Sequence, residues 1–360
     1  MAHGKKGRGN HGSMLPARVT PARMVAVPPV RREVPSLLAA MKDGNEYGSL
    51  VDLAPPNGFD VLNEVVVALR DVQQLRGRPA IMYCGNVVRR DNGDSGVDAT
   101  DDLPFAELVA SVPVDQRAVD VVLSTRGGSA HQISRFVNVL RARFDEVHFL
   151  LPTFSMSAGT LFALSGDTIT MTSRACLGPI DPQVPTKDGR YVPAQALLLL
   201  VDKLQRDGQE AMKNNEPVPW TAVRIIDGLD KKELADAITA SQYSHTMAFE
   251  FLTNFKFRRW VNHRTSGAPV TDQEKHEAAN VIANALVSHD RWKAHGHAIP
   301  REVLWNEVRL LIEHPDANLE RAMVRLWALC HWIFERTPAL KLLVSDRYRY
   351  VKNEVRLGGA

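Results

Sequence analysis

The chain is 360 residues long; 44% of its residues are hydrophobic, 24% are charged, and its formal net charge is +3. This is the composition of an ordinary soluble globular protein that can bury a substantial core. The small net charge excludes a broad basic surface, so we do not expect a nucleic acid partner.

Cysteine content and apolar run length indicate the compartment. Cys84, Cys176 and Cys330 lie far apart and are odd in number, which favours a reducing compartment over a disulfide framework. No apolar run is long enough to span a bilayer, and the N-terminus has basic residues but no apolar core of a secretory signal. We therefore expect a cytoplasmic protein with no membrane partner. Residues 1–35 are basic and rich in proline, which predicts a disordered tail.

Between residues 61 and 151 the pattern predicts alternating helices and strands. The strands are short β-branched runs, and the helices carry apolar residues on one face. In chain order we expect a helix at 61–74, a strand at 79–84, an acidic loop at 91–102, a helix beginning near Pro104, a strand at 119–124, a helix at 131–144 and a strand at 147–151. This order is typical of an α/β protein with parallel strands.

After Gln183 the pattern becomes mainly helical. We expect helices at 194–204, 231–255, 273–287, 300–314 and 318–336, with Pro300 in the first turn of the fourth. Such helices more often pack on a core or a sister subunit than bind a cofactor.

Three short runs lie where an α/β protein presents reactive groups, just after or between the predicted strands. Gly127 and Gly128 follow the strand 119–124, so backbone N–H groups there would face a ligand without interference from side chains. Ser157 opens a segment of small residues, where a helix N-terminus would place its hydroxyl near backbone donors and a positive dipole end. The third run is Leu177–Gln183, LGPIDPQ. Together the three runs suggest a serine hydrolase with Ser157 as the nucleophile.

The runs RGRPAIMYCG, DVVLSTRGGSA, FSMSAGTLFALSGDTITM and LGPIDPQ resemble the serine dehydrogenase proteinase family. This family lies in the Clp protease and crotonase superfamily and is related to signal peptide peptidase A. The resemblance covers roughly residues 76–182. It implies that Ser157 attacks a peptide carbonyl and that the N–H groups of Gly128 and Ala158 hold the oxyanion.

Composition, the helical pattern and this resemblance together predict an organisation for the whole chain. We expect a disordered basic tail at 1–35 and an α/β catalytic core at 36–200 with the ββα repeats of the Clp/crotonase fold. A helical extension at 201–360 would serve oligomerisation or donate the catalytic base. We expect a homo-oligomer that hydrolyses peptides or unfolded protein and needs no cofactor and no metal ion.

The nucleophile needs a general base, because a serine hydroxyl reacts slowly until a neighbour accepts its proton. Clp proteases carry this histidine shortly after the nucleophile, but here there is no histidine between His148 and His245. Lys203 matches the order seen in signal peptide peptidase relatives, and it would serve if burial lowered its pKa. Lys213 is a second lysine candidate.

Histidines late in the chain offer a different base. His289 and His295 lie in the run SHDRWKAHGH, which resembles a stretch found late in the dehydrogenase proteinase branch. A histidine needs less tuning to act near neutral pH. Asp181, between two prolines, either orients the base or caps a turn.

Two other classes of protein fit the same residues. Glycines and small residues also serve turns and close helix packing, so the chain is alternatively an inactive crotonase-fold scaffold or a ring-forming interaction protein. The remaining alternative is a coenzyme A thioester enzyme, which gives no reason for Ser157 and the LGPIDPQ run to occur together. We favour a serine peptidase.

Overall fold

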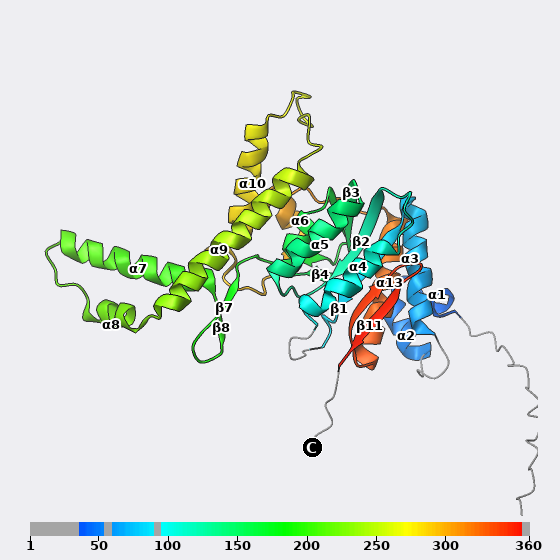
Figure 1. Cartoon of the computed structure of the whole chain (residues 1–360), viewed down its shortest axis with the longest axis horizontal. Coiled ribbons are helices and arrows are strands. Elements are labelled where there is room, and N and C mark those ends of the chain that lie inside the picture. Colours follow the sequence, from blue (N-terminus) through cyan, green and yellow to red (C-terminus); the bar gives the residue numbers. More distant parts are fainter. Residues whose placement is uncertain (1–35, 54–59, 90–94, 355–360) are drawn as a thin grey trace, which may run out of the picture. The chain divides into compact units, whose positions relative to one another are not determined.

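A six-stranded sheet in the order β11-β10-β1-β2-β3-β5 forms the centre of the fold (Figure 1). The computed structural model describes residues 36–53, 60–89 and 95–354, so the predicted tail at 1–35 lies outside the described residues. The strands of this sheet are β1 (Ala80–Gly85), β2 (Ala118–Ser124), β3 (Glu146–Leu151), β5 (Thr168–Met171), β10 (Ala339–Val344) and β11 (Arg349–Asn353). The first four run parallel, whereas β10 and β11 are antiparallel additions at one edge.

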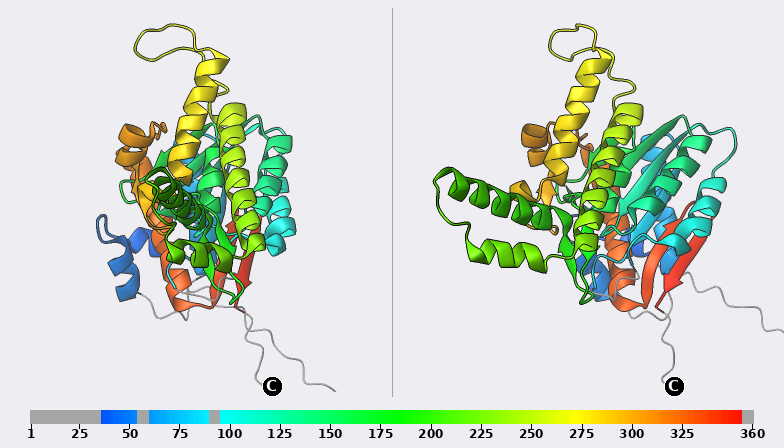
Figure 2. Two further views of the ribbon diagram at one scale, coloured as in Figure 1. Left: turned by 90° about the vertical axis from the view of Figure 1, so that its left-hand side faces the viewer. Right: turned by 60° about the vertical axis from the view of Figure 1, so that its left-hand side comes forward.

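Helices cover both faces of this sheet, because successive side chains of each strand point to opposite sides. In β1, Ile81 and Tyr83 join one apolar core, whereas Met82 and Cys84 join the other. The first core is covered by α4 (Asp102–Ala110), α5 (Ala130–Arg143), α6 (Ala158–Leu164), α9 (Lys231–Phe251) and α10 (Asp272–Val287). The second is covered by α1 (Leu37–Ala40), α2 (Glu46–Leu53), α3 (Val61–Arg76) and α13 (Ala317–Arg336). Figure 2 shows α9 and α10 side by side.

The long helix α7 and several shorter elements complete the described residues. They are η1 (Ala99–Asp101), β4 (Phe154–Ser155), β6 (Cys176–Leu177), β7 (Gln183–Pro185), β8 (Tyr191–Pro193), α7 (Ala194–Lys213), α8 (Trp220–Gly228), the π-helical turn η2 (Leu252–Lys256), α11 (His289–Trp292), β9 (Ile299–Pro300), α12 (Arg301–Val303) and the π-helical turn η3 (Leu304–Val308). Among the described helices, none combines the length and the apolar character that a bilayer crossing requires.

The predicted α/β class with parallel strands and a helical C-terminal region is confirmed. Local capping explains why the helices begin where the pattern places them: Asp60 caps α3 and Ser129 caps α5 through their side chains. Of the acidic loop expected at 91–102, residues 91–94 lie outside the described residues. Residues 95–101 precede α4, which begins at Asp102.

One predicted helix, 300–314, is wrong over nearly half of its length. Pro300 pairs with Cys176 in the short strand β9, and the helical residues are only 301–308. Arg309 then adopts a φ of 65°, and the N–H of Leu310 donates to the carbonyl of Leu304 at 2.9 Å. This left-handed residue ends the helix, since few side chains continue a right-handed helix from that conformation.

Two strands also lie where the pattern predicted only helices. β10, with the sequence ALKLLV, is buried over all six residues and inserts between β11 and β1. Its alternation is hidden by the run of leucines, and its central Lys341 is unusual in a buried strand. The last part of the chain is therefore an integral part of the sheet.

Candidate active site

Ser157 occupies a sharp turn between β4 and α6. Its backbone has φ 53° and ψ −119°, a conformation that non-glycine residues rarely adopt. Its hydroxyl makes no capping bond to the helix, so it is not held by the backbone that follows. Strained backbone of this kind is concentrated at functional sites, where the surrounding structure enforces it.

The glycine pair after β2 lies directly against this turn. Gly127 has a φ of 106°, and a Cβ atom added to it would lie 2.7 Å from the Cβ of Ser157. Gly128 has a φ of 134°, and a Cβ there would lie 2.3 Å from the carbonyl oxygen of Val97. Only glycine fits at either position, so the close approach of the two loops depends on this pair.

The backbone donors predicted for the oxyanion are not used elsewhere among the described residues. Val97 pairs with the glycine loop through the two neighbours of Gly128. Val97 N–H donates to the Gly127 carbonyl at 2.7 Å, and Ser129 N–H donates to the Val97 carbonyl at 2.8 Å. At the start of α6 the first intrahelical donors are Gly159 and Thr160. Within the described part of the chain, the N–H groups of Gly128 and Ala158 therefore have no acceptor of their own.

A cavity of about 770 Å³ opens at this point. Its lining combines Gly128, Ser157 and Ala158 with His295 from the C-terminal region. The other lining residues are Arg126, Ala130, His131, Leu161, Ile180, Pro182, Gln183, Val184, Pro185, Tyr191, Asp236, Thr239, Ala240, Tyr243 and Ser244. Ten of the nineteen lining residues are aliphatic or aromatic and eight are polar or charged, so the cavity offers both apolar contacts and polar groups to a ligand.

Two of the late histidines meet the buried carboxylate of Asp181. Asp181 is fully buried; its Oδ1 lies 2.8 Å from Nδ1 of His295 and its Oδ2 lies 3.2 Å from Nδ1 of His289. A carboxylate accepts these bonds, so each histidine donates from Nδ1 and leaves Nε2 as the proton-accepting nitrogen. Of the two histidines only His295 lines the cavity that contains Ser157.

Lys203 lies elsewhere, on the surface of α7. Its Nζ is 2.6 Å from Oδ2 of Asp207, one turn further along the helix, and its side chain is 66% exposed. The expectation that Lys203 acts as a base required burial, which the structure does not provide. Lys213, in the last turn of α7, is also exposed.

Aromatic side chains form one wall of the cavity and were not predicted. The rings of His131, at the start of α5, and Tyr243, in α9, lie 4.6 Å apart. Burial raises the pKa of the Tyr243 hydroxyl above its ordinary value. No local signal marks such residues, because they meet across elements that are more than a hundred residues apart.

This fold and cavity define an α/β protein with a serine on a strained strand-to-helix turn. Residues 105–214 match the family model of the ClpP-like SDH-type serine proteinases. The resemblance to the serine dehydrogenase proteinases is therefore confirmed over this segment, and the match supports peptidase function in general terms.

Two uncharacterized proteins of Methanocaldococcus jannaschii are similar in sequence. MJ0137 is 27% identical over 150 residues, which cover 38% of this chain and 50% of that protein. MJ1495 is 28% identical over 142 residues, which cover 35% and 46% of the two chains. The chain thus spans about half the length of the curated relatives that it matches.

Solved structures give weaker similarities. A mutant of the 1510-N membrane-bound stomatin-specific protease in complex with a substrate peptide is 14% identical, covers 62% of this chain and 73% of that chain, and has a TM-score of 0.37. A monofunctional enoyl CoA isomerase from M. smegmatis is also 14% identical, covers 59% and 92% of the two chains, and has a TM-score of 0.23.

Proposed function

We propose that the protein is a serine peptidase in which Ser157, His295 and Asp181 act together. The observation that carries the proposal is one cavity lined by Ser157, His295 and the free N–H groups of Gly128 and Ala158. A nucleophile, a base held by a buried carboxylate, and paired backbone donors are the parts that acyl transfer needs.

The steps follow from these groups. Nε2 of His295 takes the proton from Ser157 Oγ as the oxygen attacks the peptide carbonyl carbon, and Asp181 stabilises the imidazolium that forms. The Gly128 and Ala158 N–H groups hold the negative oxygen of the tetrahedral intermediate. His295 then gives its proton to the departing amine, leaving an ester on Ser157. Water, deprotonated by His295, attacks this ester, and His295 returns the proton to Ser157 Oγ as the acid leaves.

The apolar lining supports peptides or unfolded protein as substrates. Leu161, Ile180 and Val184 would contact an apolar side chain of the substrate beside the nucleophile. Folded proteins bury such side chains and hold their backbones in regular structure, so an extended and exposed segment is the better match.

The proposal gives the helical extension 201–360 a role, since His289 and His295 both come from it. The core predicted at 36–200 is incomplete, because β10 and β11 of the C-terminal region lie in its sheet. We keep the homo-oligomer and the cytoplasmic location as predictions. Exposed apolar side chains of Trp220 and Ile226 on α8 are compatible with contact between subunits. Sedimentation of the purified chain tests the oligomer, and a single monomeric species would contradict it.

Proteolysis of fluorescently labelled casein, an unfolded protein, tests the function. We expect cleavage by the wild type and none by Ser157→Ala, with unchanged thermal stability. Hydrolysis of a coenzyme A thioester without cleavage of casein would favour the thioester enzyme. A folded wild type that acts on neither substrate would favour the inactive scaffold.

A further inference from the structure

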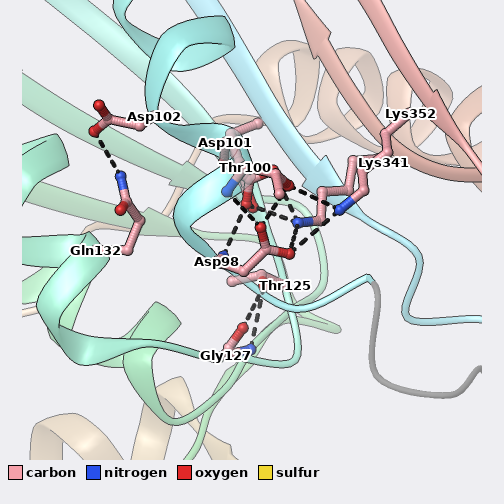
Figure 3. A network of polar contacts seen from close by, with 10 residues as sticks. Asp98, Thr100, Asp101, Asp102, Thr125, Gly127, Gln132, Lys341 and Lys352 are labelled. Carbon is pink, nitrogen blue, oxygen red and sulfur yellow. Dashed lines mark hydrogen bonds and ion pairs between the residues drawn. The ribbon is translucent and has the colours of Figure 1, made fainter.

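A buried ion cluster lies next to the segment that packs against the glycine pair. Lys341 of β10 is fully buried, and its Nζ lies 2.9 Å from Asp98 Oδ2 and 2.8 and 2.7 Å from the two carboxylate oxygens of Asp101. The hydroxyl of Tyr83 donates to Asp101 at 2.9 Å. Figure 3 shows Lys341 pointing from its strand to both carboxylates.

Other contacts tie the same segment together. The N–H of Asp98 donates to Asp101 Oδ2 at 3.0 Å. Lys352, on the neighbouring strand β11, lies 3.3 Å from Asp98 Oδ2 and 2.9 Å from the hydroxyl of Thr100. Residues 98–101 are thus fixed by two lysines that come from the last two strands of the chain (Figure 3).

The fixed segment continues directly into the wall of the oxyanion site. Val97 precedes Asp98 and makes both backbone bonds to the glycine loop, through Gly127 and Ser129. An added Cβ on Gly128 would meet the Val97 backbone, and one on Gly85 would lie 2.5 Å from the Ser95 carbonyl oxygen. Residues 95–98 are therefore packed between the end of β1 and the glycine pair, without room for movement toward either.

The free-energy cost of burying these charges indicates that the cluster serves to hold residues 97–101 in position. A lysine and a carboxylate lose most of their hydration when they are buried, and their attraction at best offsets that loss. Hydrophobic side chains would fill the position at no such cost. What the ion cluster provides is a fixed position for residues 97–101, because each carboxylate oxygen has a defined partner.

We propose that Lys341 is a positioning residue for the oxyanion site: it fixes Asp98 and Asp101, and through Val97 it fixes the N–H group of Gly128. This inference rests on the proposed function, since it gives the Gly128 donor its purpose. Lys341 touches no substrate and acts only through the segment 97–101.

The test compares Lys341→Met with Arg76→Met, which breaks another buried ion pair. Arg76 pairs with the buried Asp120 at 2.9 Å near the start of β2, at the opposite end of that strand from the glycine pair. Each variant removes the nearest cation from a buried carboxylate, so both should lower the melting temperature, although Asp120 keeps Arg78 at 3.9 Å. Asp98→Asn, at a partly exposed residue, is a milder variant that keeps the test possible if Lys341→Met does not fold.

Two readouts are measured for each variant, at a temperature where it is folded. One is the rate at which a fluorophosphonate probe labels the nucleophile, and the other is amide hydrogen exchange in residues 95–101 and 127–131. We expect Lys341→Met to slow labelling by at least about tenfold. Because the donor is misplaced and not removed, the loss should stay below the roughly hundred- to thousandfold cost of removing a donor. We expect Asp98→Asn to slow labelling by a smaller factor, and both variants to speed exchange in the two segments. Arg76→Met should change neither readout.

Equal loss of labelling in Lys341→Met and Arg76→Met would overturn the inference, because the effect would then follow stability alone. Wild-type labelling and exchange in a folded Lys341→Met or Asp98→Asn would overturn it as well. If the wild type is not labelled at all, the proposed function fails. The exchange readout then still decides whether Lys341 fixes the glycine loop.

Discussion

Two buried carboxylates, Asp181 and Asp101, have different partners. Asp181 bonds to two histidines, one of which opens to the cavity, whereas Asp101 bonds to Lys341, which is sealed from solvent. A histidine gains and loses a proton near neutral pH, whereas a paired lysine keeps its charge. Under the two proposals, a buried carboxylate supports proton transfer where its partner is a histidine and fixed geometry where its partner is a lysine.

Asp181→Asn should have the largest effect on activity in this comparison. The amide would no longer hold the Nδ1 proton of His295 with a negative charge, so the imidazolium would lose its stabilisation. We expect kcat for casein-derived peptides to fall by roughly ten-thousandfold, in line with loss of the orienting carboxylate in other Ser-His-Asp sites. A fall of less than about tenfold in a folded variant would contradict the role of Asp181.

His289→Ala should have a much smaller effect than His295→Ala. His289 bonds to the same carboxylate but does not line the cavity, so its loss removes one hydrogen bond from Asp181. Such a bond contributes about 1 kcal/mol, which corresponds to about fivefold in rate. Comparison of kcat for the two variants checks this order, and a greater loss in His289→Ala would make His289 the base.

Asp98→Asn should change how stability depends on pH. Burial acts to raise the pKa of Asp98, but hydrogen bonds from Thr100 and Lys341 outweigh it and hold the pKa well below its ordinary value. The unfolded chain therefore binds more protons, and wild-type stability is lost as pH falls below the ordinary aspartate value of about 4. We expect melting temperatures between pH 3 and pH 7 to fall less steeply toward acid in Asp98→Asn. An identical slope would show that Asp98 contributes nothing to this dependence.

Lys203→Ala should have the smallest effect. Its ion pair with Asp207 lies on an exposed helix surface, where such pairs contribute about 0.3–0.5 kcal/mol. We expect kcat within about twofold of wild type and a nearly unchanged melting temperature. Loss of casein cleavage in this variant would restore the lysine as the base and remove His295 from that role.

The nucleophile side of the site was predictable from the sequence, because its parts are local. Gly127, Gly128 and Ser157 follow strands with a clear apolar pattern, and the structure brings all three together. Their roles remain predictions, but their proximity required only that parallel strands end at the same edge of a sheet.

The sequence narrowed the candidates for the general base to a few lysines and histidines but did not decide among them. His295 and Asp181 are 114 residues apart, and only the packing of α10 and α11 against the core brings them together. Lys341 was missed for a related reason: its strand reads as a short apolar run with one charge. The partners of that charge, Asp98 and Asp101, lie more than two hundred residues earlier.

The central claim is that Ser157 is a nucleophile activated by His295. The most direct measurement is intact-mass and peptide mapping after reaction with a fluorophosphonate, for wild type, Ser157→Ala, His295→Ala and Lys203→Ala. The account predicts a single adduct on Ser157 in wild type and Lys203→Ala, none in Ser157→Ala, and strongly slowed labelling in His295→Ala. An adduct on another residue, or wild-type labelling in His295→Ala, would contradict it.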